Sequence, residues 1–192
     1  MGRIYYVMGK SASGKDTIYK KILELKPELK TVVLYTTRPQ REGEREGVEY
    51  HFTTPEALEV FGQSGKVIES RTYRTVCGPW IYATVDDGQI DLSGADYLVI
   101  GTLESFEKLK QYFGSSAVVP VYVYVEDGVR LERAMARERN QASPNYKELC
   151  RRFLADDEDF SAEHLKQAGI TGGYENLSME SCLREILADM GD

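Results

Sequence analysis

The sequence has little cysteine and histidine, and it has no long apolar run. Its three cysteines, Cys77, Cys150 and Cys182, stand far apart, and no CxxC pair is present. This spacing argues against a disulfide framework or a zinc site and indicates free thiols in a reducing compartment. No stretch approaches the ~20 apolar residues of a membrane span, and the short apolar start lacks the features of a signal peptide. We therefore expect a cytoplasmic protein with no membrane partner.

An excess of positive charge is also absent. The 192 residues carry 24 Lys and Arg against 31 Asp and Glu, which gives a net charge of −7. Because an acidic surface repels phosphate backbones, we expect no nucleic-acid partner. Hydrophobic residues make up 42% of the chain, which excludes collagen-like and wholly disordered classes. The length fits one domain, or one core domain with a modest insertion.

Apolar, strand-like runs alternate with helix-length stretches along much of the chain. The expected strands cover residues 4–8, 31–35, 96–100 and 117–125. These runs are continuous rather than alternating, which is typical of strands buried on both faces. Helices between such strands predict βαβ crossovers, so we expect an α/β fold with a mostly parallel sheet flanked by helices. In this interpretation the core is formed by residues 1–35 and 93–192.

Residues 36–92 differ in composition, and we expect them to form a smaller mixed α/β segment inserted into the core. Thr54 and Pro55 suit the N-cap and the first position of a short helix. Two strands, at 67–76 and 80–84, are then expected around a turn that contains Gly78 and Pro79.

Two arginine-rich helical segments surround a polar break, and they predict a helical lid at about 134–150. The first helix is expected from Val129 through Glu138. Ser143 suits the N-cap of the second helix and Pro144 its first position. On one side this second helix would carry Leu149, Phe153 and Leu154. On charge alone, the favoured interpretation is a solvated helical hairpin without a lid function.

A glycine-rich loop follows the first expected strand and opens the first expected helix. Glycine permits the backbone angles that point successive N–H groups at an anion, and the helix N-terminus adds partial positive charge. A lysine at the end of the loop would reach the β and γ phosphates of ATP. The alternative is an ordinary strand–helix turn. The candidate ATP-binding residues are Gly9, Lys10, Ser11, Ala12, Ser13, Gly14, Lys15, Asp16 and Thr17.

Asp16 stands where such loops usually place the hydroxyl that binds Mg²⁺. A carboxylate beside a triphosphate is repelled unless a cation lies between them. We therefore hypothesise that Asp16 contacts the Mg²⁺ that accompanies ATP, either directly or through a water.

A second motif, at residues 35–52, is rich in Arg, Glu and Gly. Arg38 and Arg41 could form bidentate bonds to one phosphate, and Tyr50 offers a hydroxyl on a rigid ring. A solvated loop is the alternative interpretation of so polar a run.

Taken in order, these motifs resemble the guanylate kinase family. The resemblance covers nearly the whole chain: the phosphate loop, T-T-R-P-x-R-x-G-E-x-x-G-x-x-Y-x-F, Val67-Ile68-Glu69, Tyr82-Ala83-Thr84 and an arginine-bearing lid. It implies a P-loop kinase core, a segment that binds a nucleoside monophosphate, and a closing lid. It also implies transfer of a phosphoryl group from ATP to GMP, and to dGMP, with Mg²⁺ as cofactor.

The resemblance further implies roles for particular residues. The GMP-binding residues would be Arg38, Arg41, Glu44, Tyr50, Glu69, Tyr82 and Thr84. The catalytic residues would be Lys15, Arg38, Arg133, Arg137 and Arg152, with Arg139 and Arg151 as neighbours that could substitute. Asn176 would lie near the adenine of ATP. Glu69 would accept from guanine N1–H and the exocyclic amine, a pattern that adenine cannot offer.

The sequence departs from the family at three places and leaves alternatives open. Asp16 replaces a Ser or Thr, Leu34-Tyr35 stands where a Ser-containing strand end is usual, and Gly101-Thr102 lies where the family carries aspartates. The Gly-Lys-Asp ending resembles kinases of ribose 1,5-bisphosphate, so another phosphorylated acceptor is one alternative. An inactive guanylate-kinase-like binding module is another. A monomer and a homodimer are both compatible with the sequence.

Overall fold

The computed structural model of the chain describes residues 2–75 and 78–191, and its centre is a parallel sheet. Every strand pair in this sheet is parallel, with β1 in the middle and β7 and β8 on either side of it. From one edge to the other the strands are β2 (Lys30–Thr31), β7 (Tyr97–Ile100), β1 (Ile4–Met8), β8 (Val118–Tyr124) and β9 (Tyr174–Glu175). The predicted α/β fold with a parallel sheet is confirmed.

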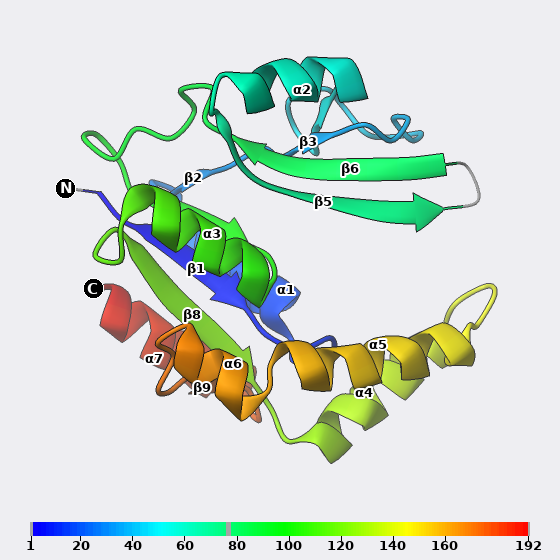
Figure 1. Cartoon of the computed structure of the whole chain (residues 1–192). Coiled ribbons are helices and arrows are strands. Elements are labelled where there is room, and N and C mark those ends of the chain that lie inside the picture. The colour runs from blue at the N-terminus through cyan, green and yellow to red at the C-terminus, as the bar shows by residue number, and fades with distance from the viewer. Residues whose placement is uncertain (1, 76–77, 192) are drawn as a thin grey trace.

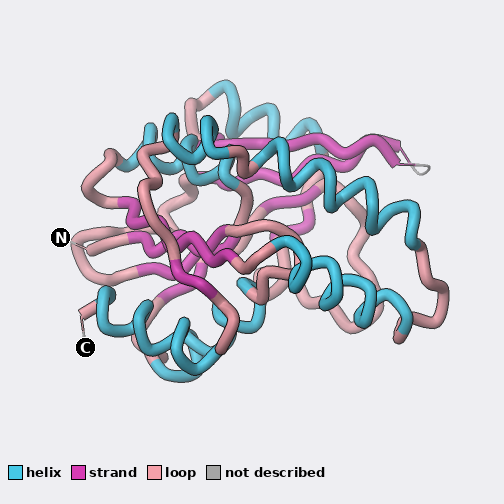
Figure 2. The backbone as a smooth tube through the Cα atoms, turned by 90° about the horizontal axis from the view of Figure 1, so that it is seen from below, coloured by secondary structure: helices cyan, strands magenta, loops and turns pink. Residues whose placement is uncertain are grey.

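Helices cover both faces of this sheet (Figures 1 and 2). Side chains of β1 alternate between the two layers: Ile4, Tyr6 and Met8 pack with one, and Tyr5 and Val7 with the other. The first layer holds α3 (Leu103–Phe113) and α6 (Ala162–Gln167), and the second holds α1 (Lys15–Leu25) and α7 (Met179–Met190). All five residues of β1 are buried, which explains its continuous apolar sequence.

A second, smaller sheet lies beside the core and carries α2 (Pro55–Gln63) (Figure 1). Its strand order is β4 (His51–Phe52), β3 (Tyr35–Thr36), β6 (Gly78–Val85) and β5 (Val67–Thr75). The side chain of Thr54 caps α2 by accepting from the Ala57 N–H, as expected. The antiparallel pair β5–β6 packs against α3, which fixes this sheet to the core.

The helices α4 (Asp127–Arg139) and α5 (Tyr146–Asp159) form the arm that was predicted as a lid. They extend from the core on the same side as the free end of the β5–β6 pair (Figures 1 and 2). The N-cap prediction for α5 was wrong: Asn145, not Ser143, accepts from the Glu148 N–H, and the helix begins at Tyr146. Of the apolar side chains predicted to share one side of this helix, Leu149 is buried and Leu154 is exposed.

The strand predicted at 31–35 was also wrong as a single element. Only its first residue, Thr31, pairs with β7 in the core, whereas Tyr35 pairs with Ala83 in the smaller sheet. The chain crosses between the sheets in the three residues between β2 and β3, so an apolar run there marks a crossing point. Val76, the last residue of the predicted strand, and Cys77, part of the predicted turn, lie outside the described residues.

Candidate functional site

The phosphate-binding loop predicted at Gly9–Thr17 connects β1 directly to α1. Gly9, Ala12 and Gly14 have positive φ angles of 154°, 64° and 91°. A Cβ on Gly9 would collide with the Val123 carbonyl oxygen, so only glycine lets the loop lie this close to β8. The loop ends at the N-terminus of α1, where unpaired N–H groups favour an anion.

Lys15 and Asp16 occupy the first turn of α1. The Lys15 ammonium lies 3.5 Å from the Asp16 carboxylate, and the Asp16 side chain is 73% exposed. In the described part of the chain, no group of three or more His, Cys, Asp and Glu side chains converges to hold a metal. A single exposed carboxylate suits an ion that keeps most of its ligands on phosphate and water, as Mg²⁺ does.

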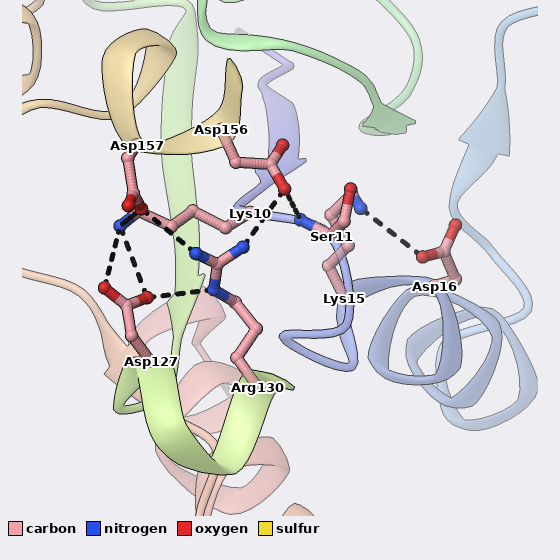
Figure 3. Close-up of polar contacts among 8 residues, drawn as sticks. All are labelled: Lys10, Ser11, Lys15, Asp16, Asp127, Arg130, Asp156 and Asp157. Carbon is pink, nitrogen blue, oxygen red and sulfur yellow. Dashed lines mark hydrogen bonds and ion pairs between the residues drawn. The ribbon is translucent and has the colours of Figure 1, made fainter. Parts of the chain in front are cut away.

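Three aspartates from the arm hold the phosphate loop, and the sequence analysis did not identify them. Lys10 Nζ lies 2.6 Å from Asp157 and 3.4 Å from Asp127. The Ser11 N–H donates to Asp156 at 2.8 Å (Figure 3). Burial opposes the charge of Lys10, but its bond to Asp157 holds the pKa above the ordinary value. The Asp156 carboxylate therefore already binds one of the backbone N–H groups that were predicted to hold an anion.

A buried arginine joins these aspartates to one another. The side chain of Arg130 is 1% exposed, and its guanidinium bonds Asp127, Asp156 and Asp157 at 2.9–3.2 Å. The same group stacks on the Phe153 ring at 3.8 Å. Figure 3 shows the network extending from the loop to both helices of the arm. These ion pairs and hydrogen bonds thus join α4 and α5 to the phosphate loop.

Asn176 and Arg133 lie on the other side of the same loop. Asn176 Nδ2 donates to the Ser13 carbonyl at 2.8 Å, and Arg133 donates to the Asn176 carbonyl at 2.9 Å. Two buried oxygens, Ser13 Oγ and Asn176 Oδ1, have no hydrogen-bond partner among the described residues. Unpaired buried oxygens of this kind are available to a ligand.

The remaining arm arginines divide into two groups. Arg137 and Arg152 line a small hollow with Ser11, beside the phosphate loop. Arg151 is 64% exposed and pairs with Glu148 at 2.7 Å on the outer surface. Arg139 lies on the outer face of α4, with Leu131 and Met135.

A second group of candidate residues is built on the smaller sheet around Arg38. This arginine is 4% exposed and makes two bonds to Glu44, at 2.6 and 2.8 Å. Its guanidinium also lies 4.9 Å from the centre of the Tyr50 ring. The bonds to Glu44 and Tyr82 raise the pKa of Arg38, and Arg38 with the Arg41 N–H lowers that of Glu44 to about 2. The result is a fixed, fully charged guanidinium.

Glu69 and Thr84 face each other across the β5–β6 pair. The Thr84 hydroxyl donates to Glu69 Oε1 at 2.8 Å, and both side chains are buried. Sequence reasoning missed a third member, Arg71, whose Nε donates to Glu69 Oε2 at 3.2 Å. Arg71 lines a hollow of about 410 Å³ between β5 and α3, with Tyr73, Thr102 and Glu107. Burial opposes the charge of Arg71, but Glu69 holds its pKa above the ordinary value.

A glycine-rich loop that joins a central parallel strand to the N-terminus of a helix is the arrangement of a phosphate-binding loop. The family model described as guanylate kinase matches residues 1–87. The resemblance to the guanylate kinase family is confirmed, and over these residues it includes the loop, the Arg38 group, Glu69 and Thr84.

Individual relatives agree with this assignment over part of their length. The chain is 30% identical over 88 residues to a guanylate kinase of Syntrophotalea carbinolica, covering 46% of this chain and 42% of that protein. It is 36% identical over 99 residues to one of Neisseria gonorrhoeae, covering 52% and 46%. The chain thus spans less than half the length of these relatives.

At the level of the fold the likeness extends further. The crystal structure of a guanylate kinase from Anaplasma phagocytophilum superposes with a TM-score of 0.62, over 98% of this chain and 84% of that one, at 18% identity. Arg133, Arg137, Arg152 and Asn176 lie beyond the region that the family model matches. None of the described helices has the length and apolar character needed to cross a membrane.

Proposed function

We propose that this chain is a guanylate kinase, which transfers the γ-phosphoryl group of ATP to GMP, and also to dGMP. The observation that carries the proposal is the buried carboxylate of Glu69, held by the Thr84 hydroxyl at 2.8 Å on the same sheet as Arg38. A buried carboxylate requires hydrogen-bond donors, and guanine presents two on one edge. Adenine, cytosine and uracil do not present this pair, and ribose 1,5-bisphosphate has no base.

The Arg38 group is the candidate phosphate site of the acceptor. Its bonds to Glu44 prevent the guanidinium from rotating freely, so little ordering remains when a phosphate binds. Tyr50 and Tyr82 have rings 5.6 Å apart beside it, and their hydroxyls could donate to the same phosphate. Arg41, which is more exposed, completes the proposed set.

The phosphate loop is the candidate site for ATP. Lys15 and the loop N–H groups would hold the β and γ phosphates, with Asn176 near the adenine. A Mg²⁺ ion held by ATP and Asp16 would neutralise charge on the phosphates when bound. We include a cytoplasmic location in the proposal, since the reaction needs free nucleotides.

In the transfer itself, an oxygen of the GMP phosphate attacks the γ phosphorus while the bond to the β-γ bridging oxygen breaks. ADP leaves with that electron pair, and GDP forms. The GMP phosphate is already ionised, so no general base is needed. The protein's task is alignment and positive charge, which Lys15, Arg38 and the arginines Arg133, Arg137 and Arg152 would supply. Removal of one such charge commonly costs roughly 10²–10³ in rate.

The proposal is tested by measuring ADP release from ATP and Mg²⁺ with a panel of acceptors. The panel contains GMP, dGMP, AMP, CMP, UMP and ribose 1,5-bisphosphate. Turnover confined to GMP and dGMP is the expected result. Turnover on ribose 1,5-bisphosphate instead would assign the chain to another kinase class, and GMP binding without turnover would make it a binding module.

A further inference from the structure

Arg71 lies between Glu69 and a hollow beside the smaller sheet. It is two residues after Glu69 in β5, so the two side chains share one face of the strand. Its Nε bonds Glu69 Oε2 at 3.2 Å, and its Nη1 reaches Thr102 Oγ1 at 3.5 Å. The side chain is 18% exposed and lines the hollow of about 410 Å³. That volume is within the range of small-molecule sites, roughly 300–1,000 Å³.

The hydrogen bonds around Glu69 leave the O6 atom of a bound guanine without a hydrogen-bond donor. A carboxylate accepts up to about four hydrogen bonds, so Glu69 can keep Thr84 and Arg71 and still accept from guanine N1–H and N2–H. The O6 atom, next to N1, then requires a donor. Thr84 has one hydroxyl hydrogen, and that hydrogen already points at Glu69 Oε1.

Arg71 has the spare donors. A guanidinium carries five N–H groups in a rigid fork. Within residues 2–75 and 78–191, Nε and Nη1 have partners, whereas Nη2 makes no hydrogen bond. A base that bonds Glu69 would meet these N–H groups beside it, because Arg71 contacts Glu69 on the same face of β5. Arginine donating to guanine O6 is a pairing that geometry favours.

We propose that Arg71 is a specificity-determining residue that donates to O6 of the guanine bound by Glu69. This inference rests on the proposed function. It divides base recognition between two charges: Glu69 reads the donors at N1 and N2, and Arg71 reads the acceptor at position 6. An amino group at position 6 would place its hydrogens against a guanidinium, so Arg71 rejects it.

The test compares acceptors that differ from GMP along the hydrogen-bonding edge of the base. The 2,6-diaminopurine ribonucleoside monophosphate keeps the 2-amino group but carries an amino group instead of O6 and has no hydrogen on N1, so the informative quantity is how much each Arg71 variant changes its kcat/KM relative to that of GMP. IMP keeps O6 and lacks the 2-amino group. The kcat/KM for each acceptor, and the Kd of GMP by calorimetry, are measured for the wild type and for Arg71→Met, Arg71→Lys and Arg74→Met. Arg74 is an exposed arginine of the same strand and serves as the matched control.

In Arg71→Met we expect kcat/KM for GMP to fall roughly tenfold to a hundredfold, as for loss of a hydrogen bond to a charged group. The kcat/KM for the diaminopurine nucleotide should change less than about threefold. The ratio of kcat/KM for GMP to that for the diaminopurine nucleotide should therefore fall by nearly the same factor as kcat/KM for GMP. The ratio of GMP to IMP should stay constant, because the 2-amino group is read by Glu69. Arg71→Lys should recover part of the preference, and Arg74→Met should match the wild type.

Equal losses on GMP and on the diaminopurine nucleotide would overturn the assignment, because they would mean that Arg71 only holds Glu69 in place. Thermal unfolding of each variant distinguishes this from a damaged fold, and the GMP Kd gives the same comparison without turnover. If the wild type neither binds GMP nor turns it over, the proposed function fails. If the wild type acts on GMP and the variants lose all acceptors alike, only the Arg71 assignment fails.

Discussion

The backbone N–H of Ser11 donates to the carboxylate of Asp156 at 2.8 Å, across 145 residues of sequence. The donor belongs to the loop that we assign to ATP, and the acceptor belongs to α5 of the arm. A side-chain anion therefore occupies one of the groups that a phosphate would use. If ATP binds this loop, its phosphates must compete with Asp156 for the Ser11 N–H, and Arg130 is the group that could retain the displaced carboxylate.

The first prediction concerns this carboxylate. Asp156→Asn keeps the shape of the side chain and removes its charge, so phosphate no longer competes with a fixed anion. We expect the Kd of ATP to fall about fivefold, which corresponds to about 1 kcal/mol. Titration calorimetry with ATP and Mg²⁺ measures it. Glu158→Gln, an exposed change on the same helix, is the control. An unchanged or weaker ATP affinity in Asp156→Asn would contradict this competition.

The second prediction concerns the metal. If Asp16 contacts Mg²⁺, Asp16→Ala should raise the Mg²⁺ concentration needed for half-maximal rate by about tenfold, which corresponds to about 1.4 kcal/mol. The half-maximal Mg²⁺ concentration of Asp16→Asn should lie between those of the wild type and Asp16→Ala, since an amide oxygen is a weaker ligand than a carboxylate. Rates are measured against free Mg²⁺ at saturating ATP. A half-maximal concentration equal to that of the wild type would show that Asp16 has no part in metal binding.

The third prediction separates the two substrates. Glu69→Gln should raise the KM of GMP about a hundredfold, because an amide offers guanine one acceptor and places an NH₂ group against its donors. The Kd of ATP should stay unchanged, since Glu69 lies on the smaller sheet. Steady-state kinetics and calorimetry measure the two quantities. Comparable losses for ATP and GMP would mean that the variant disturbs the fold instead of the base site.

The fourth prediction concerns pH. The pKa of Glu44 is about 2 in the folded chain against an ordinary value of 4.5. A lowered carboxyl pKa stabilises the folded state above the unfolded pKa, and this contribution is lost as the pH falls from about 4.5 toward 2. Glu44→Gln should therefore flatten the acid limb of the stability curve in that window. Chemical denaturation from pH 2 to 7 measures it, and an identical pH dependence in both proteins would contradict it.

Local sequence patterns predicted the structural features that depend on residues close together in the chain. The glycine loop, the cap at Thr54 and the buried strand at Ile4–Met8 are each specified by a few consecutive side chains. The resemblance supplied Arg38, Glu44, Glu69 and Thr84, which lie close to one another in pairs. In each of these cases one contiguous motif, or one strand pairing, contains the interaction.

Long-range pairings could not be predicted in the same way. Lys10 bonds Asp157 across 147 residues, and the local sequence around either residue does not indicate which partner it contacts. Arg71 looked like an ordinary strand residue, since its role depends on Glu69 and on where α3 packs. The cap at Asn145 was missed because Ser143 and Pro144 form an equally good local signal. The polar break between α4 and α5 extends past Ser143, so Asn145 caps the helix instead.

The most direct measurement of the central claim is phosphorus NMR of ATP, GMP and Mg²⁺ mixed with the protein. The account predicts that the ATP γ and GMP signals decline together while ADP and GDP appear in equal amounts. Lys15→Ala should slow this by roughly 10²–10³ with its fold intact. Appearance of ADP with inorganic phosphate and no GDP, or no reaction with the wild type, would contradict the claim that this chain phosphorylates GMP.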